Sequence, residues 1–234
     1  MRILVNHLTR MTKGFICVAG VDLETKRHVR PVVAGNMSDL VLERYGGVFN
    51  IGAVVDLGVV SYCGYPPEVE DHQFRPRRAV KLADASPVKF WAMLQAMAKR
   101  SLRGIFGAEL KLCKVRGGYS CALEKNRGAA SLGCLAPAGR PKLCLDAFGK
   151  VRALVCDGEF TCTVPVTDLR LYERDHETPR LKALEDVNRR MARGVEVILS
   201  VGVSQPFQKT GEAVERHWLQ VNNLHLVDDP VWKV

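Results

Sequence analysis

The sequence has no long apolar run. Its best stretch, residues 51–60, is interrupted by Asp56, whereas a membrane-spanning helix needs about 20 predominantly apolar residues. The apolar part of the N-terminal segment is too short for a secretion signal. We therefore expect a cytoplasmic protein without a membrane partner.

Closely spaced cysteine pairs are also missing. The 8 cysteines are at positions 17, 63, 113, 121, 134, 144, 156 and 162, and no two have the C-x₂₋₄-C spacing of a structural zinc site. Most lie in apolar segments such as 15–18 and 143–145. We expect reduced thiols that pack as small hydrophobic side chains, and no bound metal or other cofactor.

Catalytic signatures are absent as well. The sequence contains no Walker A loop, no G-x-S-x-G, no H-E-x-x-H and no dinucleotide fingerprint. Cys17 and His28 fall on neighbouring predicted strands, but no third group is predicted to orient them as a nucleophile pair. A non-enzymatic role is therefore favoured.

Aromatic residues are few, at 7% of the chain. Proteins that bind single strands in an OB barrel use aromatic side chains as stacking platforms for the bases. The shortage counts against a strong single-strand binder and fits recognition of a nucleic-acid backbone or shape better.

Positive charge is plentiful and unevenly placed. The net charge is +9, but residues 73–152 hold 17 Lys and Arg against 4 Asp and Glu, a net +13, and the rest holds 17 against 21, a net −4. A block of this kind is a reasonable footprint for a polyanionic partner, although a solvated basic surface would look the same.

Hydrophobic patterning predicts a mainly β protein with a few helices. Strands are expected over most of 3–63 and 110–172, and closing strands at 195–203 and 217–227. Strict alternation predicts that only one of His217 and Trp218 faces the core. Ser86 and Pro87 mark the start of a helix that reaches about residue 102, and residues 38–45 could form a short helix.

Short strands with glycine bends, and a helix between two β-rich regions, suggest two OB-like small β-barrels packed in one compact unit. We assign the first barrel to residues 1–85, the linking helix to 86–104 and the second barrel to 105–234. The second region includes a helix at about 179–193, with an apolar face at residues 181, 184, 187 and 191.

Several segments resemble prokaryotic dual OB domain-containing proteins. They are the opening 3–10, then 14–20, 28–32 and 52–57, the loop 67–73, the segment 160–168 that ends in Thr167-Asp168, and the closing 199–207. The resemblance covers most of the chain. It implies two OB-like barrels and association with nucleic acid or nucleotides, and no defined reaction.

The leading hypothesis is a non-enzymatic protein that binds DNA or RNA on a basic surface between the barrels. Its candidate contacts are basic residues of the first barrel and of the charged window, with two aromatic residues beside them for stacking. They are Arg10, Lys13, Arg27, Arg30, Phe74, Arg75, Arg77, Arg78, Lys114, Arg116, Tyr119, Lys125 and Arg127.

Two alternatives remain. The basic face could instead dock a partner protein or a guide RNA, so that the chain is an adaptor subunit of a larger nucleoprotein complex, for example a defence complex. A single groove lined by Arg30, Arg75, Arg78, Lys125 and Arg127 would favour direct binding, and scatter would favour the adaptor.

The third hypothesis, and the second alternative, is a metal-dependent nuclease built on the acidic loop. Its residues would be Glu68, Glu70, Asp71 and His72, because hard divalent cations prefer carboxylate ligands. A solvated loop, or local contacts to the neighbouring arginines, accounts for the same residues without a metal.

Overall fold

The computed structural model describes residues 1–11, 14–209 and 213–232. It confirms a mainly β fold with several sheets, and the described residues contain three α-helices. The strands of the described part of the chain form three sheets, and no closed barrel is found among them. The architecture is therefore β-rich as predicted, while two closed OB barrels are not confirmed.

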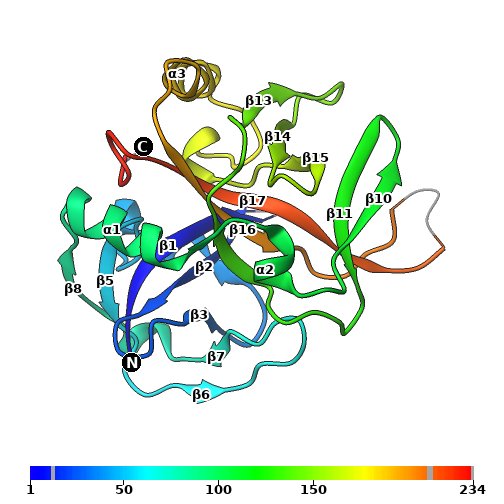
Figure 1. The fold of residues 1–234 in the computed structure, drawn as a ribbon. Helices are drawn as coiled ribbons and strands as arrows, with labels where there is room; N and C mark the ends of the chain where they lie inside the picture. Colours follow the sequence, from blue (N-terminus) through cyan, green and yellow to red (C-terminus); the bar gives the residue numbers. More distant parts are fainter. Residues whose placement is uncertain (12–13, 210–212, 233–234) are drawn as a thin grey trace.

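The N-terminal part of the chain forms an eight-stranded sheet (Figure 1). Its order is β6 (Ser61–Tyr62), β7 (Asp71–Gln73), β3 (His28–Val32), β2 (Phe15–Asp22), β1 (Arg2–Arg10), β5 (Ala53–Asp56) and β8 (Val80–Asp84), with β4 (Met37–Ser38) paired to β2. Most pairs are antiparallel, but β3 and β7 run parallel. The predicted helix at 38–45 is instead two 3₁₀ turns, η2 (Asp39–Val41) and η3 (Glu43–Tyr45).

The remaining strands form two further sheets. The six-stranded sheet has the order β10 (Lys111–Val115), β11 (Gly118–Glu124), β17 (Arg216–Leu226), β16 (Val197–Val203), β12 (Leu132–Leu135) and β9 (Ala98–Lys99). The three-stranded sheet has the order β13 (Lys142–Leu145), β14 (Val151–Cys156) and β15 (Thr161–Pro165). Residues 157–158 lie in the turn of the hairpin that β14 and β15 form.

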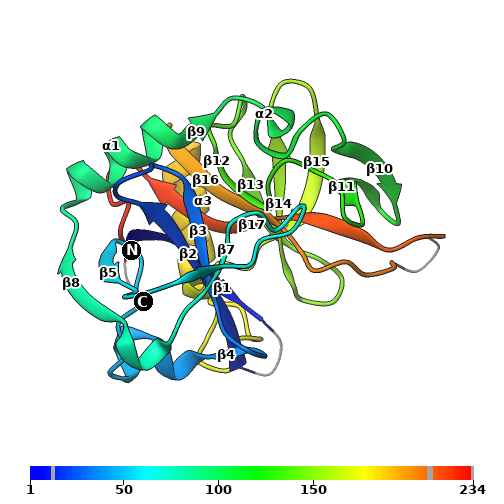
Figure 2. The same cartoon turned by 90° about the horizontal axis from the view of Figure 1, so that it is seen from below.

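Helix α1 (Pro87–Met97) begins where the sequence predicts and ends earlier. The Ser86 hydroxyl accepts a hydrogen bond from the Lys89 N–H, which satisfies one of the free donors of the first turn. Figure 2 shows α1 running from the side of β8 to β9. Two shorter elements follow in place of a longer helix, because residues 98–99 pair with β12 and α2 (Leu102–Phe106) starts after them.

Helix α3 (Leu181–Ala192) lies within the predicted segment. Leu184, Val187 and Met191 are its buried residues, and their spacing places them on one face of the helix. The prediction for Leu181 is wrong, because this residue begins the helix and is 53% exposed. On the exposed side Asp186 pairs with Arg190 at 3.7 Å. The helix therefore packs against the C-terminal core by the face that the periodicity indicates.

Strand β17 departs from simple alternation. His217 and Trp218 are both 1% exposed, so the prediction that only one of them is buried is wrong. The strand lies between β11 and β16, and both of its faces are covered. The His217 Nδ1 atom lies 2.9 Å from the Ser204 carbonyl oxygen, and the indole N–H of Trp218 donates to the Phe207 carbonyl.

The hydrophobic core has two clusters. One lies within residues 102–226. The other is formed mainly by the first sheet and α1, but it also includes Cys134, Leu169 and Ile198 from the C-terminal part of the chain. The two parts therefore share buried surface, and the division into domains at residues 85 and 105 stays a prediction.

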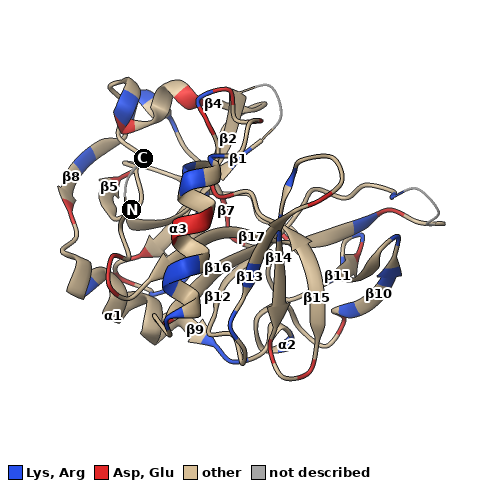
Figure 3. Cartoon of the chain, turned by 90° about the horizontal axis from the view of Figure 1, so that it is seen from above, with Lys and Arg blue, Asp and Glu red and all other residues tan. Residues whose placement is uncertain are grey.

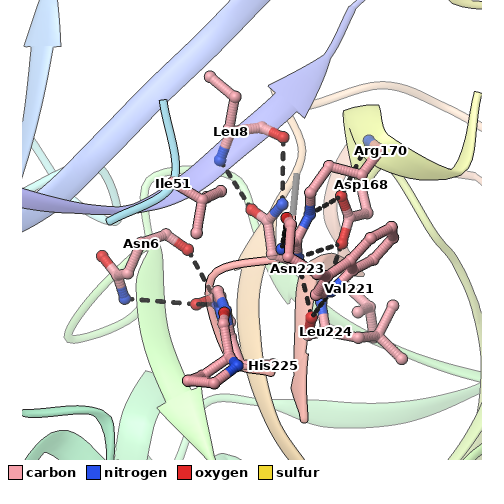
Figure 4. Close-up of polar contacts among 12 residues, drawn as sticks. Asn6, Leu8, Ile51, Asp168, Arg170, Val221, Asn223, Leu224 and His225 are labelled. Carbon is pink, nitrogen blue, oxygen red and sulfur yellow. Dashed lines mark hydrogen bonds and ion pairs between the residues drawn. The ribbon is translucent and has the colours of Figure 1, made fainter. Parts of the chain in front are cut away.

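Side chains rather than a backbone ladder connect β1 to β17 (Figure 4). The Leu8 N–H donates to Asn223 Oδ1 at 2.7 Å, and Asn223 Nδ2 donates to the Leu8 carbonyl at 3.3 Å. The Asn223 amide thus serves the donor and the acceptor of one β1 residue. Nearby, Arg170 binds both carboxylate oxygens of Asp168, at 2.9 and 2.8 Å.

No helix in the described part of the chain is long and apolar enough to cross a membrane.

Candidate functional site

An arginine-lined pocket opens at the edge of the first sheet. It has a volume of about 770 Å³ and lies between the loop before β6, the end of β7 and the 3₁₀ turn η4 (Pro76–Arg78). The lining residues are Gly58, Val59, Ser61, Gln73, Phe74, Arg75 and Arg78. We call it the arginine pocket.

The local sequence explains why the arginines point outward. Pro76 begins η4, and the Ala79 N–H closes the turn by donating to the Pro76 carbonyl at 3.1 Å. Phe74 and Ala79, on either side of the turn, are buried at 5% and 8% exposure. With both flanking residues anchored in the core, the three arginines of the segment are exposed.

These arginines keep their charge available. Among the residues that the structure describes, no carboxylate forms an ion pair with the guanidinium of Arg75, Arg77 or Arg78. The neighbouring Lys81, by contrast, pairs with Glu43 and with Asp84. Guanidinium groups without acidic partners are suited to bind a phosphate through paired N–H donors.

A second set of candidate contacts lies on the β10–β11 hairpin. Lys114 and Arg116 are exposed, and the Tyr119 side chain is 50% exposed. At the end of β11, Arg127 is exposed, while Lys125 forms an ion pair with Glu215 at 2.8 Å. Figures 1 and 2 place this hairpin on the opposite side of the molecule from η4.

The candidate residues of the first barrel have varied surroundings. Arg27 is exposed. Arg10 lies over the Tyr172 ring at 4.1 Å and donates to the His176 carbonyl at 2.6 Å. Lys13 lies outside the described residues.

Two candidates are buried, contrary to the role expected of them. Arg30 is 8% exposed and its Nε donates to Asp71 at 2.5 Å, so this guanidinium is occupied inside the protein. The Phe74 ring packs edge-on to Phe49 at 6.1 Å and does not present a free face to a base. Both residues serve the packing of the first sheet.

The predicted contacts therefore do not line one groove. Arg75 and Arg78 line the arginine pocket, Arg30 is internal, and Lys125 and Arg127 lie beyond β11. Figure 3 shows Lys and Arg residues spread over several elements, including β8, α3 and β10. The sequence locates a basic segment, but the fold distributes it over the surface.

The acidic loop is used for internal contacts. The Glu70 carboxylate is buried and accepts hydrogen bonds from the Ser131 N–H at 2.9 Å, the Ser131 hydroxyl at 2.7 Å and the Leu132 N–H at 3.2 Å. Burial raises the pKa of Glu70, although the bonds from Ser131 oppose this. Asp71 pairs with Arg30.

These contacts hold the acidic loop against the C-terminal part of the chain. Within the described residues, the side chains at 68–72 do not converge into a group that could hold a metal ion. The geometry does not favour the nuclease hypothesis.

Three histidines where the sheets meet are a feature that sequence reasoning missed: His7 and His225 are buried, and His28 is half-buried. Burial lowers the pKa of His28 to about 4 and of His225 to about 3, and it also lowers the pKa of His7. These imidazoles are therefore neutral at neutral pH.

Cys17 and His28 lie on the neighbouring strands β2 and β3, as the sequence predicts, but they are not opposite each other. The register of β2 and β3 places His28 opposite Val21, while Cys134 Sγ of β12 lies 3.8 Å from His28 Nε2. No local pattern could indicate this neighbour, because it is 106 residues away.

Comparison with protein-family models gives no match for this chain, and comparison with curated protein sequences gives none either.

Proposed function

We propose that this protein binds nucleic acid without acting as an enzyme, and that the arginine pocket receives the phosphate backbone. The observation that carries the proposal is the pair of exposed arginines, Arg75 and Arg78, that line a pocket of about 770 Å³ without a carboxylate partner among the described residues. Phosphate contacts supply most of the affinity in sequence-independent binding.

The surroundings of the pocket add to this proposal. Ser61 and Gln73 line it with neutral hydrogen-bonding groups, which commonly contact phosphate and sugar oxygens. Tyr62, the next residue of β6, is 63% exposed, and its ring contacts His72 edge-on at 5.3 Å. It supplies the exposed aromatic face that Phe74 does not, so a base next to the bound phosphate could stack on it.

The family resemblance leads to the same proposal. A dual OB domain-containing protein would be expected to bind a polyanion, and a mainly β architecture with several sheets is compatible with membership. A cytoplasmic location, which the sequence analysis predicts, is part of the same proposal. Fold analogy is the weaker support, and the arginine pocket is the stronger one.

The test compares wild type with the double variant Arg75→Ala/Arg78→Ala in binding to single-stranded and duplex oligonucleotides across a salt series. Loss of two phosphate contacts should weaken binding about equally for all sequences. It should also reduce the slope of log K against log salt by about 1.4 for single strands. Fluorescence anisotropy with labelled oligomers measures both quantities.

Arg193→Ala is the matched control. Arg193 is an exposed arginine at the end of α3, and it does not line the pocket, so its loss should leave affinity and slope nearly unchanged. Absence of binding by the wild type at low salt, or equal binding by the double variant, would overturn the proposal.

A second candidate function is supported by the separation of the two basic sites. The exposed β10–β11 hairpin lies away from the arginine pocket, so it could dock a protein or guide RNA as part of an adaptor subunit. The test is co-purification from the native host with wild type and with Lys114→Glu/Arg116→Glu. An adaptor predicts a stoichiometric partner that the hairpin variant loses, together with poor binding of free oligomers by the isolated chain.

A further inference from the structure

A cluster of metal-binding side chains lies where the two largest sheets meet. His7 of β1, His28 of β3 and Cys134 of β12 each offer one ligand atom, and these atoms all lie within 4.8 Å of one another. Two residues belong to the first sheet and the third to the six-stranded sheet. We propose that His7, His28 and Cys134 form a zinc site that links these two sheets.

The donor set matches zinc chemistry. Protein zinc is bound by imidazole nitrogen at about 2.0–2.1 Å and thiolate sulfur at about 2.3 Å in tetrahedral sites, which places ligand atoms about 3.3–3.8 Å apart. The sulfur of Cys134 and Nε2 of His28 are already 3.8 Å apart. Because all three ligand atoms lie within 4.8 Å of one another, the longest separation must shorten by at most about 1.5 Å to reach tetrahedral geometry.

His7 provides the independent sign of a ligand. The side chain is 1% exposed, and its Nε2 atom has no hydrogen-bond partner. A buried ring nitrogen left unpaired is costly, and a metal ion would satisfy it. The other ring nitrogen, Nδ1, lies 3.1 Å from the side-chain amide of Asn222.

This amide orients the imidazole. In the structure Asn222 Nδ2 faces His7 Nδ1, and Asn222 Oδ1 is buried without a hydrogen-bond partner. Rotation of this amide by half a turn presents Oδ1 to His7, so that Nδ1 carries the proton and donates it, and the lone pair of Nε2 is free to bind the metal. Most metal-binding histidines have such a partner on the second nitrogen. Asn222 therefore acts as a positioning residue.

Asn6 and Ser200 surround the sulfur. The Asn6 amide lies 3.3 Å from Cys134 Sγ and 3.4 Å from His28 Nε2. It also contacts the Ser200 hydroxyl at 3.3 Å. Its oxygen is buried without a hydrogen-bond partner. Rotation of the amide by half a turn would place this oxygen where Nδ2 now lies, at ligand-to-ligand distances from the sulfur and from His28 Nε2, so Asn6 could supply the fourth ligand.

His28 is half-buried, whereas His7 and Cys134 are fully enclosed, so the cluster is closest to solvent at His28. Binding replaces the thiol proton of Cys134 with the metal, and the proton leaves to the buffer. The bound ion would then join β1 and β3 to β12, three strands that no backbone ladder connects directly.

The experiment measures zinc in the full chain. Wild type is stripped with a chelator, dialysed with excess zinc, desalted and analysed for metal content, and Co²⁺ is added to a second stripped sample. We expect about one zinc per chain, a rise in melting temperature on zinc addition, and a thiolate-to-cobalt absorption band. Cys134→Ser and His28→Gln should each weaken zinc binding at least 100-fold and should abolish the zinc-dependent stabilisation.

Cys144→Ser is the matched control, because Cys144 is an exposed cysteine outside the cluster; this variant should bind zinc like wild type. Circular dichroism of each stripped variant checks that it is folded. His28 is the least buried ligand, so His28→Gln keeps the test decisive if Cys134→Ser does not fold. Wild type without stoichiometric zinc, or a folded ligand variant that retains wild-type affinity, would overturn the proposal.

Discussion

Glu70 shows how one residue can look functional in sequence and serve packing in the structure. It lies in an acidic loop that resembles a cation site, yet its carboxylate is taken up by the backbone N–H groups of Ser131 and Leu132 and by the Ser131 hydroxyl. The residue ties the loop to a segment 61 residues away. Its chemistry is that of a buried hydrogen-bond acceptor.

Two substitutions of Glu70 distinguish the loss of its hydrogen-bond acceptor from the loss of its charge. Glu70→Ala leaves the N–H groups of Ser131 and Leu132 without their acceptor, and it should lower the free energy of unfolding by about 2–3 kcal/mol. Glu70→Gln keeps an acceptor of the same shape and should cost much less. Urea denaturation measures both variants, and equal losses would contradict this account.

The difference in stability between Glu70→Gln and wild type should also depend on pH. The pKa of Glu70 is raised in the folded state by burial, so its favourable contribution is fully present below the unfolded value of 4.5 and is lost as pH rises through the folded pKa. The stability of Glu70→Gln relative to wild type should therefore increase over that interval and stay level above it. A flat difference between pH 4 and 8 would show that the pKa is unshifted.

At the scale of elements, two β-bulges bring polar side chains into the centre of the molecule. The register of β1 shifts between Val5 and His7, and that of β16 and β17 shifts near Asn222. A bulge adds one residue to a strand and re-aims the neighbouring side chains. Asn6 and Asn222 are the extra residues, and both side chains lie beside the histidine–cysteine cluster.

The bulge in β1 depends on a close approach that only glycine permits. A Cβ atom on Gly20 of β2 would lie 2.6 Å from the Leu4 carbonyl oxygen. Gly20→Ala should therefore push the two strands apart and cost about 2–3 kcal/mol of stability. Thermal or urea unfolding measures the effect.

Gly139→Ala is the control for that variant. The nearest atom to an added Cβ at residue 139 is 3.8 Å away, which is ordinary contact, so the change should stay within about 0.5 kcal/mol. If Gly20→Ala were as stable as this control, the bulge would not require the close approach.

At the scale of the whole molecule, Asp168 and Arg170 form a buried ion pair that connects the segment before α3 to β17 and to Trp232. Both side chains are at most 2% exposed. The guanidinium also donates to the Leu224 and Trp232 carbonyls, while the carboxylate accepts from the Leu224 N–H. A buried pair is strongly destabilised when one member is removed, because the other charge stays buried and uncompensated.

Asp168→Ala should accordingly lower the free energy of unfolding by about 3–5 kcal/mol. Asp186→Ala removes a carboxylate from an exposed ion pair on α3 and should cost less than about 1 kcal/mol. Urea titrations followed by circular dichroism distinguish the two. A small loss of unfolding free energy for Asp168→Ala would mean that the ion pair contributes little to the stability of the fold.

The parts of the structure that the sequence could predict are those that local rules determine. Ser86 and Pro87 specify the start of α1, and the spacing of Leu184 and Val187 indicates the buried face of α3. Pro76 and its neighbours predict a loop that carries arginines. These features depend on side chains within a few positions of one another.

The rest depends on distant partners. The sequence suggests that Arg30 is a surface cation, but in the structure it pairs with Asp71 on the neighbouring parallel strand. His28 has no visible partner in sequence because Cys134 reaches it only after the sheets meet. The alternation rule fails at His217 because both faces of β17 are covered. Each of these contacts depends on the tertiary structure, which the periodicity of the sequence does not predict.

The Asn223 side chain has a consequence for the order in which the chain folds. It supplies the hydrogen-bond partners of Leu8, a residue translated 215 positions earlier. Until β17 leaves the ribosome, the Leu8 N–H and C=O groups have only water as a partner, and the core around β1 lacks Leu169 and Ile198. The N-terminal sheet is therefore completed late in synthesis. Until then β1 exposes unsatisfied backbone groups, which could pair with another strand or another chain.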